Sequence, residues 1–140
     1  MRPAEEVRAE LVRGWIARAE EDYRVAIFLA DEKAPYPGAV AFHAQQATEK
    51  HLKAALVHFQ LEFPKTHDLG QLLDLLAGAD PQLAEQLRQA TELNPFGVAT
   101  RYPGDLPDVT DEEAGAAVRI SELVRSLVPA RVTGSSGPEA

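Results

Sequence analysis

The sequence predicts an all-α protein: an up-and-down helical bundle of four main helices plus one short helix. Apolar residues recur at the three- and four-residue spacing that places them on one side of a helix. No convincing run alternates apolar and polar residues as a half-buried strand would. The breaks, rich in proline and glycine, are mostly short, and long helices with short connections pack as antiparallel neighbours.

The first two helices are expected at residues 5–31 and 38–61, separated by the Pro-Tyr-Pro-Gly break at 35–38. Asp22 lies at the edge of the stripe that the first helix should bury. The apolar members of that stripe are Val12, Trp15, Ile16, Ala19, Tyr23, Ala26 and Leu29.

A short third helix is expected at 68–77, with Thr66 or Asp68 as its N-cap. A fourth helix should span 81–93, because Asp80 can cap it and proline is favoured at the first helical position.

A long linker with three prolines should follow at 94–109, and linkers of this length inside a compact domain are often functional. The fifth helix is expected at 110–128. Thr110 and Glu113 have the spacing of a capping box, and Pro129 should end the helix.

The chain of 140 residues fits a single domain over 1–132, followed by a flexible tail at 133–140. Its formal net charge of −8 argues against an extensive nucleic-acid footprint, which needs a basic face. The absence of cysteine removes disulfides, thiolate metal sites and thiol nucleophiles. With no apolar run of membrane-spanning length and no signal-peptide pattern, a cytoplasmic protein is expected.

The helix expected at 38–61 carries an unusual row of polar residues beside its apolar side. Gln45 even falls within the apolar arc, and buried polar groups need hydrogen-bond partners. The row consists of His43, Gln46, Glu49, Lys50 and Lys53. Such a row could bind an anionic ligand or form a polar subunit contact. The alternative is a solvated helix face on which Glu49 and Lys53 form an ordinary ion pair.

Two further segments offer groups suited to a phosphate ligand. His67, between Thr66 and Asp68, stands at the start of a helix, where the dipole favours anions. The alternative is that Thr66 and Asp68 only cap that helix. Arg101 could bind a phosphate and Tyr102 could stack on a base, or both could be ordinary loop residues.

Three segments, in this order and spacing, resemble the HEPN domain (higher eukaryotes and prokaryotes nucleotide-binding), and the resemblance covers about residues 15–128. They read Ala41-Phe42-His43-Ala44-Gln45-Gln46-Ala47-Thr48-Glu49-Lys50-His51-Leu52-Lys53-Ala54, then Lys65-Thr66-His67-Asp68-Leu69, then Arg101-Tyr102-Pro103. The resemblance implies a helical bundle that is usually dimeric and can bind a nucleotide. In prokaryotes such proteins are often encoded beside a small nucleotidyltransferase, so the resemblance also implies this partner, and the pair can act as a toxin–antitoxin module.

Many members of that family are metal-independent RNA endonucleases that carry Arg, four to six residues, then His. In this sequence Leu106, Pro107 and Asp108 follow Arg101 at that spacing, and no other arginine has a histidine there. The missing titratable group argues against ribonuclease activity.

The sequence therefore predicts a non-catalytic nucleotide-binding protein, with ATP or another nucleotide as ligand and no cofactor or metal. The nucleotide-binding residues would be His43, Gln46, Lys50, Lys53, His67, Arg101 and Tyr102. Asp22, Gln45 and Glu49 would be structural or interface residues. One alternative is an RNA endonuclease toxin that uses Arg101 with a histidine elsewhere, such as His67. The other is a helical dimerisation or scaffold protein with a polar interface, and a homodimer or higher oligomer is expected.

Overall fold

A computed structural model of the protein describes residues 2–97 and 108–133, which form six helical segments and no strand. The segments are α1 (Ala4–Asp31), α2 (Pro37–His58), α3 (Leu69–Ala77), α4 (Pro81–Gln86), the 3-10 helix η1 (Arg88–Phe96) and α5 (Asp111–Val132). The predicted all-α helical bundle is confirmed. None of these helices is both long and apolar enough to cross a membrane.

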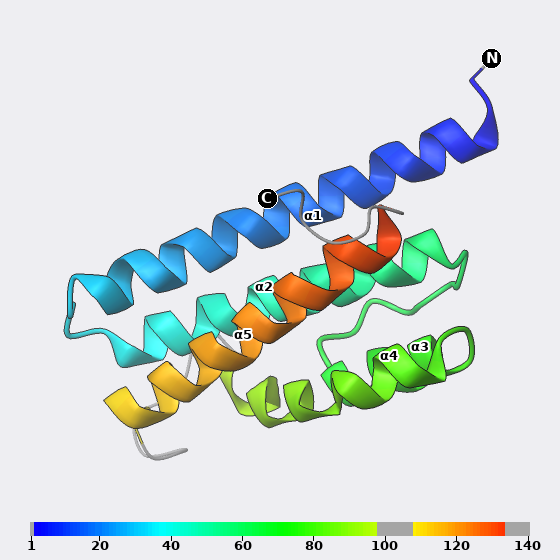
Figure 1. The fold of residues 1–140 in the computed structure, drawn as a ribbon. Helices are drawn as coiled ribbons and strands as arrows, with labels where there is room; N and C mark the ends of the chain where they lie inside the picture. The colour runs from blue at the N-terminus through cyan, green and yellow to red at the C-terminus, as the bar shows by residue number, and fades with distance from the viewer. Residues whose placement is uncertain (1, 98–107, 134–140) are drawn as a thin grey trace.

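Figure 1 shows α1 and α2 running antiparallel, with α5 alongside them. The three shorter segments, α3, α4 and η1, connect α2 to α5. Helix α2 is the central element, since it contacts α1, α5, α3 and η1. Most of its length is buried, including the polar residues Gln45, Glu49 and Lys53. The row of polar residues therefore lies on the most enclosed helix of the bundle.

Helix α2 ends at His58, three residues before the predicted end at Leu61. The backbone of Gln60 has a φ of 59°, the left-handed conformation that ends many helices. The amide of Leu61 then donates to the carbonyl of Leu56 at 2.9 Å, and the amide of Gln60 donates to Val57 at 3.0 Å. These bonds satisfy the last carbonyls of the helix, so the chain turns away there.

The predicted fourth helix at 81–93 is only partly correct, because α4 ends at Gln86 and a 3-10 helix continues to Phe96. Leu87, Ala90 and Leu93 are all buried and are spaced three residues apart. A 3-10 helix has three residues per turn, so it places such residues on one side, where an α-helix would rotate them apart. The predicted linker at 94–109 therefore begins later, and its residues 98–107 lie outside the described residues.

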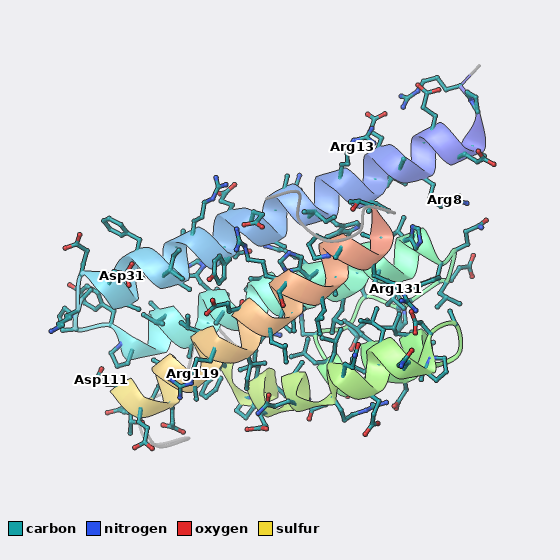
Figure 2. The ribbon with its side chains drawn as sticks, viewed as in Figure 1. Arg8, Arg13, Asp31, Asp111, Arg119 and Arg131 are labelled. Atoms are coloured by element: carbon teal, nitrogen blue, oxygen red, sulfur yellow. The ribbon has the colours of Figure 1, made fainter. Side chains whose placement is uncertain are left out.

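The capping box predicted for the fifth helix is present: Thr110 accepts from the Glu113 amide at 3.0 Å and Glu113 accepts from the Thr110 amide at 2.9 Å. The predicted stop at Pro129 is wrong, because α5 continues to Val132. Val132 is buried, and Arg131, labelled in Figure 2, forms an ion pair with Asp80, the N-cap of α4. Most of the predicted tail, residues 134–140, lies outside the described residues.

Candidate functional site

Two carboxylates organise the polar row of α2, and each binds one histidine and one lysine. Asp22 of α1 accepts from Nδ1 of His43 at 2.9 Å and from the ammonium of Lys50. We call Asp22, His43 and Lys50 the Asp22 cluster. An ionised carboxylate can only accept hydrogen bonds, so Nδ1 of His43 carries the proton, and Nε2 has no hydrogen-bond partner in the described part of the chain.

The second cluster, the Glu49 cluster, lies deeper. Glu49 accepts from Nζ of Lys53 at 2.9 Å and from Nδ1 of His67 at 3.0 Å, and Gln45 donates to it at 3.3 Å. The side chain of Glu49 is only 4% exposed, whereas that of His67 is 73% exposed. The Glu49 cluster, consisting of Gln45, Glu49, Lys53 and His67, thus joins a buried carboxylate to a surface imidazole.

The two lysines differ in their surroundings. The side chain of Lys50 is 25% exposed, and that of Lys53 is 10% exposed. The Lys53 ammonium lies 5.6 Å from the centre of the Trp15 ring and 5.9 Å from that of Phe63, distances at which cation–π attraction is significant. Lys53 is therefore held inside the molecule, and Lys50 lies at its edge.

Charge pairing decides the ionisation of Glu49. Burial alone would raise the pKa of its carboxyl group, but the hydrogen bonds from Lys53 and His67 outweigh burial and hold the pKa below its ordinary value. Glu49 is therefore an anion at neutral pH, and its charge is balanced by Lys53. Each of the two carboxylates is thus paired with one lysine ammonium, and the two opposite charges of each pair cancel.

Gln46 connects the row to the buried amide beside it, since its Nε2 donates to Oε1 of Gln45 at 2.7 Å. Gly97, at the end of η1, approaches that same amide. A Cβ atom at position 97 would lie 3.1 Å from Nε2 of Gln45. Sequence reasoning missed Gly97, because its importance depends on a contact between residues 52 positions apart.

The start of α3 positions the loop that carries His67. Of the two predicted N-cap candidates, Asp68 is the N-cap, and it accepts from the Gly70 amide at 2.9 Å. Asn94 of η1 accepts from the Leu69 amide at 2.8 Å and donates to Asp68 at 3.2 Å. Asn94 was not among the predicted site residues, and nothing in its local sequence marks it as the link between η1 and α3.

The structure thus divides the predicted residues between two adjoining clusters. His43 and Lys50 share Asp22; Lys53, His67 and Gln45 share Glu49; and Gln46 bonds to Gln45. Arg101 and Tyr102 lie outside the described residues, so their approach to the clusters stays a prediction. No group of three or more histidine, aspartate or glutamate side chains in the described ranges could hold a metal ion.

A family model described as the HEPN domain matches residues 12–131 of the chain. The crystal structure of an archaeal HEPN homologue is similar with a TM-score of 0.67 and 24% sequence identity, over 86% of this chain and 97% of that one. At this identity the similarity shows the fold alone. None of the curated proteins with which the sequence was compared matches it. Because the family model matches most of its length, the chain belongs to the HEPN domain family.

Proposed function

We propose that this HEPN protein binds a nucleotide at the Asp22 cluster and performs no chemistry on it. The observation that carries the proposal is the shared carboxylate: Asp22 fixes both Lys50 and His43 at a partly open position. An ammonium group has three donors, and Asp22 occupies one of them. The other two donors have no partner among the described residues and can meet phosphate oxygens, and Nε2 of His43, the ring nitrogen that Asp22 does not bind, can contact the same ligand.

The exposure of the predicted nucleotide-binding residues supports different roles for them. Lys53 is enclosed by Trp15, Phe63 and Glu49, so its role in this proposal is to hold the Glu49 carboxylate. His67 is largely exposed, and its Nε2 has no hydrogen-bond partner among the described residues, so it can reach a ligand from the α3 side. Gln46, half-buried, completes the described part of the site.

A near-neutral site needs additional positive charge to hold a polyphosphate, and Arg101 is proposed to supply it. A guanidinium can bind two phosphate oxygens at once. Tyr102, the next residue, is proposed to lie against the base or ribose. Both assignments rest on the sequence pattern and the family.

Calorimetric titration with ATP, and with other nucleotides in parallel, tests the proposal. We expect Lys50→Ala to weaken binding at least tenfold, because it removes the ammonium that meets the phosphates. Lys33→Ala removes the same charge from the exposed turn between α1 and α2 and should leave affinity unchanged. Absence of heat at millimolar nucleotide, or equal affinity of the wild type and Lys50→Ala, would refute the proposal.

A second candidate, ribonuclease activity, is favoured by one observation. In both clusters a carboxylate binds Nδ1 of a histidine, which is how a carboxylate orients an imidazole for proton transfer through Nε2. His67 could then act with Arg101 on the 2′-hydroxyl of RNA. Incubation of the pure protein with total RNA in a chelator decides it: intact RNA would exclude this candidate.

A small nucleotidyltransferase is the proposed protein partner, in a toxin–antitoxin-like pair, and this part rests on family membership alone. Co-expression with a nucleotidyltransferase encoded beside the gene, followed by purification on one tag, tests it. Recovery of a stable complex is expected, and recovery of the tagged chain alone would count against the pairing.

A further inference from the structure

The side-chain amides of Gln45 and Gln46 form a chain of hydrogen bonds that ends at the Glu49 carboxylate. Nε2 of Gln46 donates to Oε1 of Gln45 at 2.7 Å, and Nε2 of Gln45 donates to Oε1 of Glu49 at 3.3 Å. Gln45 and Glu49 are buried, whereas Gln46 is only half-buried. The chain therefore runs from the interior of the bundle to the edge of the proposed site.

The charge of Glu49 fixes the direction of this chain. A carboxylate that binds Lys53 and His67 is ionised, and an ionised carboxylate accepts hydrogen bonds but cannot donate them. Gln45 must therefore turn its NH₂ group toward Glu49, which leaves its carbonyl oxygen for the NH₂ group of Gln46. A flipped Gln45 would set its oxygen against the carboxylate and its NH₂ group against that of Gln46, so the hydrogen bonds decide the orientation of both amides.

At the outer end of the chain, the carbonyl oxygen of Gln46 is the acceptor that remains. It has no hydrogen-bond partner among the described residues. Gln46 lies between His43 and Lys50 along one side of α2, at intervals of three and four residues, which make side chains neighbours. A nucleotide whose phosphates meet Lys50 therefore has its nucleoside part within reach of this oxygen.

We infer that Gln46 determines specificity at the proposed site by accepting a hydrogen bond from the nucleoside part of the ligand, with Gln45 as the residue that positions it. The inference rests on the proposed nucleotide binding. A carbonyl oxygen repels phosphate oxygens but suits the donors of a nucleoside, which are the amino group of the base and the hydroxyls of the ribose. The second N–H of the Gln46 amide can bond to an acceptor beside that donor, as glutamine does with the N6 and N7 edge of adenine.

Calorimetry with ATP and three analogues, each lacking one donor, tests the inference. Purine riboside triphosphate lacks the amino group of the base, and 2′-deoxy-ATP and 3′-deoxy-ATP each lack one ribose hydroxyl. We expect one analogue to bind about tenfold more weakly than ATP, because it leaves the Gln46 oxygen without a partner, and that analogue identifies the donor. Equal affinity of all four ligands would overturn the inference, whereas absence of heat with every ligand would refute the nucleotide binding on which it rests.

Gln46→Ala tests whether this side chain is the source of the difference. The variant should bind ATP and the weaker analogue equally, since the contact that distinguishes them is removed and the contacts of Lys50 with phosphate remain. Gln82→Ala, which replaces an exposed glutamine of α4, is the matched control and should keep the tenfold difference. A Gln46→Ala variant that keeps that difference would overturn the inference.

Gln45→Met tests the positioning role. Methionine has a similar length but lacks both groups of the amide that orients Gln46. We expect the difference between ATP and the weaker analogue to shrink several-fold, whereas a merely structural role of Gln45 would lower stability and leave the ratio of the two affinities unchanged. An unchanged ratio in the folded variant would refute the positioning, and if the variant does not fold, Gln46→Ala still decides the inference.

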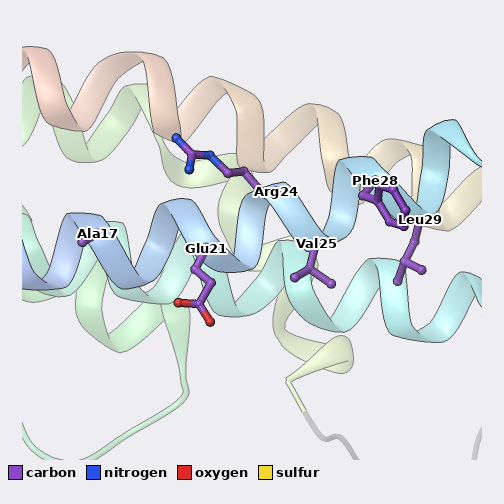
Figure 3. A pocket seen from close by; sticks show the side chains of 6 residues that line it. All are labelled: Ala17, Glu21, Arg24, Val25, Phe28 and Leu29. Carbon is purple, nitrogen blue, oxygen red and sulfur yellow. The ribbon is translucent and has the colours of Figure 1, made fainter.

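A hollow on the outer side of α1 offers a nucleotide another place, which the experiment must distinguish (Figure 3). It is lined by Ala17, Glu21, Arg24, Val25, Phe28 and Leu29, none of which belongs to either cluster. Arg24 provides a positive charge there, and the ring of Phe28 is 63% exposed. Arg24→Ala should nevertheless leave the affinities for ATP and its analogues unchanged. Loss of ATP binding in Arg24→Ala, with Gln46→Ala binding as the wild type does, would place the ligand on α1 and overturn the inference.

Discussion

At the scale of single residues, the position and exposure of each lysine depend on the carboxylate that binds it. Asp22 reaches Lys50 from another helix and leaves it at the edge of the molecule, whereas Glu49 holds Lys53 one turn away within α2. The helical spacing predicts that Glu49 and Lys53 lie next to each other. It does not predict that His67, 18 residues further on, would approach Glu49 from the α3 side.

Gly97 supports the Glu49 cluster, and its replacement by alanine tests that role. The new Cβ would lie 3.1 Å from Nε2 and 3.2 Å from Cδ of Gln45, which is fully buried. We expect Gly97→Ala to lower the free energy of unfolding by about 1–2 kcal/mol, as overpacking usually does. Urea denaturation followed by circular dichroism measures it.

Gly14→Ala is the matched control for that prediction and should have the opposite sign. Position 14 is exposed in the middle of α1, and a Cβ there would meet nothing within 4 Å. Alanine should stabilise the helix by about 0.5–1 kcal/mol. If both variants changed stability in the same direction, close approach to Gln45 would not be the cause at position 97.

At the scale of helices and their ends, most of the structure follows from local rules that the sequence displays. The capping box at Thr110, the N-cap at Asp68 and the N-cap at Asp80 each depend on a side chain within three residues of the amide that it binds. The early end of α2 follows from the left-handed backbone at Gln60, whereas the wrong boundaries of the fourth and fifth helices depend on packing. The 3-10 turn after Gln86 serves the burial of Leu93, and α5 continues past Pro129 because Asp80 holds its last turn.

Arg131 should therefore stabilise the contact between the last turn of α5 and the start of α4. Its guanidinium donates to Asp80 from Nε at 2.7 Å and lies 2.6 Å from it through Nη2, and the Asp80 side chain is only 6% exposed. Arg131→Ala would leave that carboxylate without its charged partner, so we expect a loss of about 1–3 kcal/mol in the free energy of unfolding. Thermal or urea unfolding measures the change.

Arg119→Ala provides the comparison within the same helix, because Arg119 is exposed and pairs with no carboxylate in the described residues. Its effect should stay within about 0.5 kcal/mol, as for most surface substitutions. An equal loss in the two variants would show that general charge on α5, rather than the contact with Asp80, matters.

At the scale of the whole molecule, the bundle buries two polar side chains whose burial the sequence pattern did not predict. His51 of α2 and Ser121 of α5 are fully buried, and none of their side-chain polar atoms has a hydrogen-bond partner in the described structure. Helical spacing predicts which side of a helix is apolar, and it placed Gln45 within that side. The fold class was predictable for that reason, whereas the burial of His51 and Ser121, which depends on how three helices meet, was not.

The buried imidazole makes the stability of the bundle depend on pH. Burial lowers the pKa of His51 to about 4 from 6.5, with Glu20 of α1 opposing the shift and Arg125 of α5 adding to it. The unfolded chain therefore binds the proton more readily than the folded one between these two values. Stability from this group is complete above pH 6.5 and is lost as pH falls toward 4, by about 3 kcal/mol in all.

Urea denaturation of the wild type and of His51→Leu, at intervals between pH 7.5 and pH 5, isolates the effect. The lowered pKa of Glu49 affects stability only below its unfolded value of 4.5, outside this range. His58, whose pKa burial also lowers, acts in the same direction, so His58→Leu is the control and should keep most of the slope. The wild type should lose stability steadily with acid, and His51→Leu should lose much less. Parallel lines for the wild type and His51→Leu would mean that His51 is not the group through which acid loosens the contact among α1, α2 and α5.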